Sequence, residues 1–429
     1  MSRKEQYIVY VGSIPSGVLE NVVRYIKTKK RPWKVMLWRA TDLDFPIPEE
    51  TKYFRVEHVD FSDPEDIKDI IAEYEGQIAC VTARKDTNIP YLQKTIPHLP
   101  EGLRLPMVAA LERGVDKIKM RKAFSKYSQK ITPKYEIIDD LQNAKPSQFK
   151  TKLHFPVIVK PDGLQAALLV QAAYYPEELK EILTKMQKTI GKIYKRDAGR
   201  GTISVLIEEI IEGDQYSVDV HIGNSGTIYF NPFVKYTMAR QMGYDDFFSY
   251  EQTTPATISK ESLEKARQVC ADGIAALKLR NSSAHIELIR REGEWKIVEI
   301  GPRIGGFRPE MYGRSFGINI DMNDVLIRMG KKPIIPRVKK GYSSAIKFYP
   351  REEGYVTRIA GIQKAKELKS FESMSVLRNR GKKSLHAKHG GRYVVRVTLF
   401  NKDKSQFIKD KRKLEKMIKI TTVKQKPSV

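Results

Sequence analysis

Cysteine is almost absent from this chain, and so are the long apolar segments of membrane proteins. Only Cys80 and Cys270 occur among 429 residues, which argues against a disulfide framework and against a cysteine metal site. The longest uncharged apolar runs, such as 157–159 and 166–170, fall far short of the roughly 20 residues that a membrane-spanning helix needs. The first residues lead directly into a strand-like run, so we expect no signal peptide. These absences predict a soluble, cytoplasmic protein that does not act at a membrane.

Acidic residues are scarce in the last part of the chain. The net charge is +26, and residues 331–429 contribute +21 of it through 28 Lys/Arg against 7 Asp/Glu. A lysine-rich solvated surface explains this excess most simply. A field that attracts anionic ligands such as ATP is a second interpretation. Binding to RNA or another polyanion is a third, although no helix-turn-helix, zinc-finger or aromatic RNA-binding motif accompanies the charge.

The first 110 residues alternate between strand-like and helix-like patterns, as in a small Rossmann-like module. Strands are expected at 7–11, 34–38, 54–56 and 78–82, and helices at 18–29 and 67–74. The segment 12–17 lacks the Gly-x-Gly start of a dinucleotide fingerprint and contains a proline. We interpret it as a tight turn, with a substrate site lined by its amides as the alternative.

Two further blocks follow. A basic helix is expected at 115–128, and an α/β block then runs to about residue 330. Its predicted strands are 157–160, 204–208, 216–222, 285–290 and 295–299, and its predicted helices are 177–187 and 261–277. Residues 331–429 are strand-rich, with strands at 344–349, 356–362 and 393–399 and a basic helix at 405–418. This organisation predicts three domains, 1–110, 111–330 and 331–429.

An apolar strand ends at Lys160 and is followed by Pro161-Asp162-Gly163. A lysine whose stem lies along a buried strand has a fixed ammonium group, and a fixed cation suits phosphate oxygens. A lysine that simply extends to solvent at a strand end gives the same pattern and is commoner. The segment alone leaves both interpretations open.

A second segment, 205–219, joins two apolar strands through the acidic turn that follows Glu208 and Glu209. An extended backbone in such a place can present amide and carbonyl groups to an adenine edge, and a nearby acidic side chain can bind ribose hydroxyls. Taken alone, the segment is also an ordinary hairpin with a solvated turn.

Two strands further along carry one glutamate each, Glu287 and Glu299, and Glu292-Gly293-Glu294 separates them. Antiparallel pairing about Gly293 places the two glutamates opposite each other. Facing carboxylates on a buried sheet repel unless a cation lies between them. Hard oxygen ligands without a Cys or His cluster favour Mg²⁺. The alternative is that one of the glutamates faces solvent.

These segments and the following Arg303-Ile304-Gly305-Gly306, in this order and spacing, resemble the ATP-grasp superfamily of carboxylate–amine ligases. The resemblance is greatest to the L-amino acid (dipeptide) ligases of the alanine–anticapsin type. It implies an α/β (α+β) ATP-grasp fold with an N-terminal preATP-grasp domain and a strand-rich C-terminal subdomain. It also implies an ATP-dependent enzyme that activates a carboxylate as an acyl phosphate, releases ADP, and forms an amide with an amine.

The resemblance also implies roles for particular residues. Lys117 and Lys160 correspond to the lysines that contact the nucleotide phosphates. The hinge over adenine corresponds to Glu208, Glu209 and Ile211, and the ribose contact to Asp214 or Gln215. Metal ligands for Mg²⁺, or for Mn²⁺ as an alternative, correspond to Glu287 and Glu299, and the catalytic cations to Arg303 and Lys160. Amino acids or a peptide are the implied substrates, and a homodimer is compatible with the family.

The sequence departs from the family pattern at three places. Gly301 stands where the family has an asparagine, Gln165-Ala166-Ala167 replaces glycines and serines in the phosphate loop, and Gln215 stands where a glutamate is usual. The alternatives are therefore an ATP-grasp carboxylase or purine-type ligase, and a degenerate nucleotide-binding protein without turnover. Substrate specificity is expected in 307–315 and in 236–250, which we expect to be a loop or short helix beside the site that orders with substrate.

Overall fold

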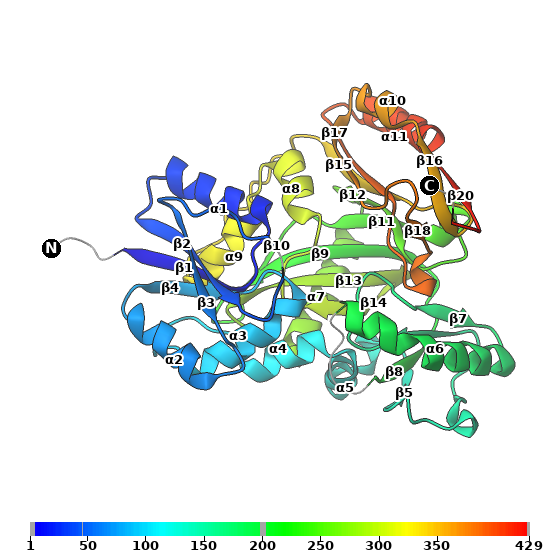
Figure 1. Ribbon diagram of the computed structural model, residues 1–429, viewed down its shortest axis with the longest axis horizontal. Coiled ribbons are helices and arrows are strands. Elements are labelled where there is room, and N and C mark those ends of the chain that lie inside the picture. The colour runs from blue at the N-terminus through cyan, green and yellow to red at the C-terminus, as the bar shows by residue number, and fades with distance from the viewer. Residues whose placement is uncertain (1–4, 45, 198–202, 427–429) are drawn as a thin grey trace.

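The computed structural model describes residues 5–44, 46–197 and 203–426, and its strands form four sheets (Figure 1). The first sheet is parallel, with the order β3-β2-β1-β4. Its elements are β1 Gln6–Gly12, α1 Ser16–Thr28, β2 Trp33–Ala40, β3 Phe54–Val59, α2 Pro64–Glu73 and β4 Ile78–Thr82. Parallel strands need helical crossovers and become buried on both faces, which explains why β1 is apolar almost throughout. The predicted Rossmann-like module is thus present.

Helices cover both faces of this sheet. Ile8 and Tyr10 of β1 pack with α1 and with α9 (Ile320–Arg328), whereas Val9 and Val11 pack on the other face with α2. Pro64 lies in the first turn of α2, and the Asp63 side chain accepts a hydrogen bond from the Glu65 amide, so the helix begins where its local sequence favours a start. The two cysteines are buried in separate cores, Cys80 in this one and Cys270 in that of the large sheet.

Three helices connect the first sheet to the rest: α3 Ile89–Thr95, α4 Val108–Val115 and α5 Lys117–Tyr127. The prediction of one basic helix over 115–128 was wrong at its start. Asp116 lies between α4 and α5 with an extended backbone, and its carboxylate accepts a hydrogen bond from the Lys119 amide at 2.7 Å. The chain breaks there because an aspartate caps the second helix better than it continues the first.

A small antiparallel sheet with the order β5-β8-β6-β7 follows. Its strands are β5 Tyr135–Ile138, β6 Val157–Pro161, β7 Gln171–Ala173 and β8 Val205–Glu209, and α6 Pro176–Asp197 lies on one face. Val157, Val159 and Val205 form the core under α6. Because side chains alternate along a strand, Lys160 and Glu208 lie on the opposite face.

The largest sheet has nine strands in the order β14-β13-β9-β11-β12-β15-β19-β17, with β10 paired to β9. Its strands are β9 Asp214–Ile222, β10 Ile228–Phe230, β11 Val234–Met238, β12 Ser249–Thr254, β13 Ser282–Arg291, β14 Glu294–Gly301, β15 Tyr342–Phe348, β17 Phe371–Val376 and β19 Val395–Asn401. The apolar residues of α7 (Lys260–Leu277) pack with those of β9, β13 and β14. Residues 236–250 are therefore not a loop throughout, because β11 and β12 occupy both ends and the 3₁₀ turn Ala239–Met242 lies between them.

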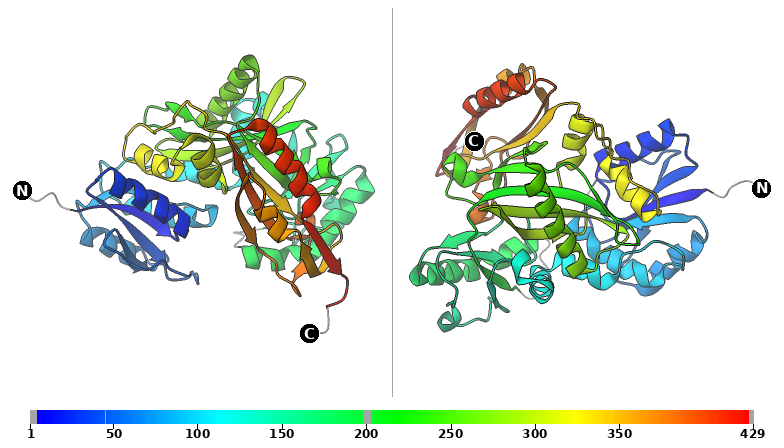
Figure 2. Two further views of the ribbon diagram at one scale, coloured as in Figure 1. Left: turned by 90° about the horizontal axis from the view of Figure 1, so that it is seen from above. Right: turned by 180° about the vertical axis from the view of Figure 1, so that it is seen from behind.

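The C-terminal strands β15, β19 and β17 extend this large sheet, and β18 Lys383–Ser384, β16 Gly354–Ala360 and β20 Lys419–Val423 form a separate three-stranded one. The helices here are α8 Arg308–Phe316, α10 Ile362–Lys366 and α11 Lys404–Met417. Figures 1 and 2 show the C-terminal segment and the small sheet on the side of the large sheet away from the N-terminal module. Within the described ranges, no helix combines the length and apolar character needed to cross a membrane. The division at 110 and 330 stays a prediction.

Candidate active site

A cavity of about 440 Å³ lies between the small sheet and the large sheet. Its walls come from β6 and β8 on one side, from β9, β13 and β14 on the other, and from the loops at 164–168 and 239–247. A volume of this order is typical of small-molecule sites. Most of the residues that the sequence singled out lie on its wall: Lys117, Lys160, Glu208, Glu209, Ile211, Gln215, Glu287 and Glu299.

A buried carboxylate holds the cationic part of this wall in place. Glu208 Oε1 accepts a hydrogen bond from Arg121 Nε at 2.5 Å, and Glu208 Oε2 accepts one from Lys160 Nζ at 2.6 Å. Burial alone would raise the pKa of the Glu208 carboxyl, but the charges of Arg121 and Lys160 lower it to about 2. Arg121 also donates to the Val298 carbonyl at 2.7 Å and so links both sheets. The Lys160 ammonium is consequently fixed at the cavity, whereas a solvated strand-end lysine would be free to move.

The predicted hinge begins at Glu208, the carboxylate of this ion pair, and continues to Ile211. The amide of Glu209 donates to the Lys134 carbonyl at 3.0 Å, and the amide of Ile210 donates to the Pro156 carbonyl at 3.4 Å. The Glu209 side chain pairs with Lys296 at 3.0 Å. Because the amides of Glu209 and Ile210 donate to carbonyls inside the protein, the backbone of Ile211 remains the candidate for contact with a base.

Lys117 is the first residue of α5 and lies beside the loop that follows β6. Its amide donates to Asp162 Oδ1 at 2.8 Å, and its Nζ donates to the Leu164 carbonyl at 2.8 Å. Lys117 therefore lies against this loop, and the loop residues Leu164 and Leu168 line the same cavity.

The loop over the cavity has an unusual backbone. Ala166, Ala167 and Leu169 have positive φ angles of 58°, 57° and 61°. This left-handed region costs a residue with a side chain roughly 1–2 kcal/mol relative to the right-handed one. A hydrogen bond from the Leu169 amide to the Ala387 carbonyl, 3.0 Å long, ties the loop to the C-terminal segment. The loop is thus closed over the cavity by the last part of the chain.

Glu287 and Glu299 lie directly opposite each other on β13 and β14, as predicted, but the two-residue turn alone does not bring this about. Leu288 pairs with Ile297, and a β-bulge between Glu287 and Leu288 shifts the register so that Glu287 meets Glu299. The turn residues Glu292 and Gly293 have φ angles of 53° and 86°, which is the two-residue geometry that matches strand twist. Both glutamates line the cavity. No group of three or more His, Cys, Asp or Glu side chains that could hold a metal occurs in the described part of the chain. Two facing carboxylates fit Mg²⁺ that keeps waters and phosphate oxygens as its other ligands.

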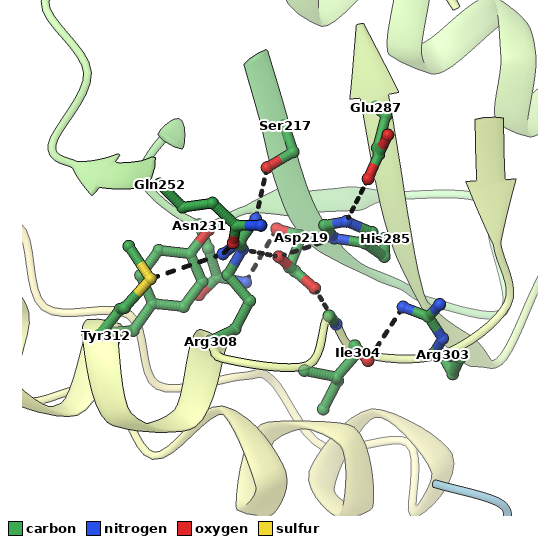
Figure 3. Close-up of polar contacts among 12 residues, drawn as sticks. Ser217, Asp219, Asn231, Gln252, His285, Glu287, Arg303, Ile304, Arg308 and Tyr312 are labelled. Atoms are coloured by element: carbon green, nitrogen blue, oxygen red, sulfur yellow. Dashed lines mark hydrogen bonds and ion pairs between the residues drawn. The ribbon is translucent and has the colours of Figure 1, made fainter. Parts of the chain in front are cut away.

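The sequence did not reveal a buried network behind Glu287 (Figure 3). Asp219 accepts hydrogen bonds from Arg308 Nε at 3.0 Å and from the Gly305 amide at 2.6 Å, and it lies 3.2 Å from His285 Nδ1. His285 Nε2 lies 3.5 Å from Glu287 Oε1. Burial would lower the pKa of His285, but the charge of Asp219 outweighs it and raises that pKa. The network joins β9, β13 and the loop after β14.

Arg308 is the centre of the same network on its other side. It donates to Ser217 Oγ at 2.6 Å, to Gln252 Oε1 at 2.8 Å and to the Tyr236 hydroxyl at 3.0 Å. The side chain is almost completely buried. A lone aspartate at 219 within an apolar strand was the available signal for this network, whereas nothing in the pattern around 308 marked the arginine.

Arg303 does not line the cavity and instead contacts the N-terminal module. Its Nε and Nη2 donate to Asp86 Oδ2 at 2.8 and 2.6 Å. Arg84, two residues before Asp86, donates to the Ile304 carbonyl at 2.8 Å. Asp86 and the nearby Glu299 raise the pKa of Arg303 despite its burial. The turn after β4 therefore holds the loop that carries Arg303.

The two candidates for the ribose contact behave differently. Gln215 lines the cavity, and its amide group donates to Glu287 Oε2 at 3.3 Å. Asp214 does not line it, because its carboxylate pairs with Lys235 at 3.1 Å and with Arg290 at 3.5 Å. The structure places only the first of these side chains at the site. Residues 236–250 lie beside the site as expected, since Arg240, Gln241 and Phe247 belong to the cavity wall.

Gly301 has space for a side chain, and its backbone is outside the left-handed region. A Cβ atom there would lie 3.5 Å from Asp86 Oδ1 and 3.6 Å from Arg303 Cζ, which are ordinary contacts. We expect Gly301→Asn to lower the Mg²⁺ concentration needed for half-maximal activity about fivefold, the effect of roughly 1 kcal/mol from one added polar contact. A Mg²⁺ titration at fixed ATP measures this. Gly223→Asn, where a Cβ atom also meets only ordinary contacts, is the control, and identical titrations for both would place Gly301 outside the metal shell.

Comparisons with known proteins agree with this geometry. Residues 153–309 match the family model described as an ATP-grasp domain. An L-amino acid ligase from Bacillus licheniformis has a similar structure, with a TM-score of 0.74 at 19% identity over 98% of this chain and 100% of that one. An N5-carboxyaminoimidazole ribonucleotide synthetase from Thermotoga maritima matches with a TM-score of 0.62 at 17% identity over 97% and 100%. No curated protein matches the sequence significantly.

These matches define the class. Residues 153–309 carry an ATP-grasp domain, and nearly the whole chain shares the fold of the solved L-amino acid ligase. The family resemblance and the fold class predicted from the four sequence segments are thereby confirmed.

Proposed function

We propose that the protein is an ATP-dependent carboxylate–amine ligase that forms an amide through an acyl phosphate and releases ADP and phosphate. One observation carries this proposal: a single cavity has Lys160 of the small sheet and Lys117 of α5, both held by hydrogen bonds, together with two facing carboxylates of the large sheet. Lysines suit phosphate oxygens, and facing carboxylates suit a divalent cation that itself binds phosphates. Together they are what a nucleoside triphosphate with its metal requires.

Phosphoryl transfer needs positioned charge more than covalent help from the protein. Lys117 and Lys160 would bind the phosphates, and Glu208 keeps Lys160 in one position. Arg303 pairs with Asp86 outside the cavity wall, near Glu299, and the family resemblance alone assigns it the role of facing the phosphoryl group as it moves to the substrate carboxylate. Mg²⁺, when bound between Glu287 and Glu299, supplies further neutralisation of the phosphate charge.

The closed loop supports the second half of the reaction. An acyl phosphate is hydrolysed by water, so the site must exclude solvent until the amine attacks. Residues 164–168 line the cavity, and the hydrogen bond from the Leu169 amide to the Ala387 carbonyl ties this loop to the C-terminal segment. No side chain has to form a covalent intermediate, since the amine substrate itself displaces phosphate.

Amino acids are the substrates that we propose first. The solved L-amino acid ligase has a TM-score of 0.74, above the 0.62 of the carboxyaminoimidazole ribonucleotide synthetase. A carboxylating or purine-type ligase is the second candidate, because the chain also shares its fold with the carboxyaminoimidazole ribonucleotide synthetase.

A pairwise panel of amino acids with ATP and Mg²⁺ tests the proposal. We expect ADP release that depends on two amino acids and a dipeptide of matching mass in the same sample. ADP release that requires bicarbonate instead would identify the carboxylating class. ATP binding without ADP release under any condition would contradict ligase activity and favour a nucleotide-binding protein without turnover.

A further inference from the structure

Three polar side chains lie side by side on the C-terminal part of the large sheet, outside the cavity described above. Lys347 of β15 is directly opposite Arg396 of β19, and Arg396 is directly opposite Ser375 of β17. Residues opposite each other in antiparallel strands point to the same face. Lys347 Nζ also donates to Ser249 Oγ of β12 at 2.9 Å. The sheet thus presents a row of hydrogen-bond donors across four strands.

The two cations of this row lie beside the same aromatic ring. Lys347 Nζ lies 5.3 Å and Arg396 Cζ lies 4.7 Å from the centroid of the Phe307 ring. Phe307 follows Gly305 and Gly306 in the sequence. The Gly305 amide donates a hydrogen bond to the buried Asp219, and Gly306 is exposed. The cationic row therefore borders the loop that carries Arg303 and leads into α8, which begins at Arg308.

The positive charge of the row is poorly balanced by the protein. In the described part of the chain, no carboxylate lies within ion-pair distance of Lys347, and its hydrogen-bond partner Ser249 is neutral. Arg396 reaches Glu310 only at 3.9 Å, and Glu310 also accepts a hydrogen bond from Ser373. Two like charges on neighbouring strands repel.

Buried donors in the row also lack partners. Within the described residues, Arg396 Nε is buried without a hydrogen-bond partner, and so is Ser375 Oγ. A buried donor without a partner costs roughly 1–3 kcal/mol, so an acceptor that reached both would be bound favourably. Lys347, Ser375, Arg396 and Phe307 are all only partly buried, which leaves them accessible to a solute.

The row is electrostatically coupled to the active site. Burial lowers the pKa of Lys347 to about 8, the charges of Arg308 and Arg396 act in the same direction, and the charge of Glu287 opposes them. Hydrogen bonds connect the two places. Ser249, which accepts from Lys347, also accepts from Gln252 at 2.9 Å, and Gln252 accepts from Arg308. Arg308 donates to the Tyr236 hydroxyl, which donates to Glu287 Oε1 at 3.3 Å.

We propose that Lys347, Arg396 and Ser375 form a subsite for an oxyanion, carboxylate or phosphate, of a substrate whose reacting group lies at Glu287 and Glu299. This inference rests on the proposed ligase function and narrows its substrate class. At least one substrate carries an anionic group that does not react, as the carboxylate of an amino acid that serves as the amine does. The Phe307 ring, which lies within 5.3 Å of both cations, gives the subsite an apolar wall.

Binding measurements test the subsite without requiring turnover. Succinate and inorganic phosphate, as carboxylate and phosphate probes, are titrated by calorimetry into the full-length protein with ADP and Mg²⁺. Wild type should bind one of the two. Lys347→Met and Arg396→Gln should each weaken that binding about tenfold or more, as expected for a lost charge-assisted hydrogen bond, with ATP affinity unchanged. Arg358→Gln, an exposed arginine on β16, is the matched control.

The outcomes separate the subsite from the proposed function. Equal probe binding by wild type and both variants, or no binding of either probe, would overturn the subsite. Probe binding that depends on Lys347 and Arg396 in a protein that ligates no substrate would overturn the ligase proposal and leave the subsite standing. If Lys347→Met does not fold, Arg396→Gln alone decides, since the Arg396 side chain is partly exposed.

Discussion

Replacing Lys160 with methionine should reduce ADP release by about a hundredfold or more while the protein stays folded. The loss of a positioned charge at a developing phosphate charge commonly has an effect of this size. Methionine keeps the apolar stem along β6, and Glu208 keeps Arg121 as its partner at 2.5 Å. The buried carboxylate is therefore still paired, so the substitution removes the cation from the cavity without leaving an isolated buried charge.

The control for this experiment is another strand lysine in an ion pair. Lys34 lies on β2 and pairs with Glu5 at 2.5 Å, far from the cavity in the N-terminal module. Lys34→Met should leave ADP release unchanged. Circular dichroism and thermal melting establish that both variants fold. Near-normal ADP release by folded Lys160→Met would remove Lys160 from the site.

Strands and turns with strong local patterns could be predicted from the sequence. The apolar run before Lys160 predicted the strand β6, and the turn at Glu292 and Gly293 predicted the hairpin on which Glu287 faces Glu299. The β-bulge that completes this pairing was not predicted. These predictions succeeded because side-chain period and turn geometry are properties of neighbouring residues.

Contacts between distant segments could not be predicted in this way. Arg303 and Asp86 are 217 positions apart, and Arg308 and Asp219 are 89 apart, so no period or spacing connects them. The same holds for Arg121, which reaches Glu208 from another part of the chain. Asp214 and Gln215 differ for a related reason: adjacent residues of a strand point to opposite faces, and only the structure shows which face is the cavity.

The last prediction concerns the facing carboxylates. Glu299→Gln should reduce ADP release by about a hundredfold or more, because glutamine keeps the shape of the side chain but removes a ligand charge from the phosphate–metal site. It should also raise the Mg²⁺ concentration needed for ATP binding, measured by calorimetry. Glu294→Gln is the matched control, since Glu294 begins the same strand and is exposed.

Without metal, Glu299→Gln should not destabilise the protein, although it reduces activity. Glu287 and Glu299 are opposite each other on a sheet, and like charges in that arrangement repel. Removing one charge relieves this repulsion, so the melting temperature in the presence of a chelator should stay the same or rise, while Mg²⁺ with ATP should raise it less than in wild type. A residue that only supports the fold would lose stability and activity together. A lower melting temperature with chelator and normal Mg²⁺-dependent ATP binding would therefore show that Glu299 acts in the fold and not in the metal site.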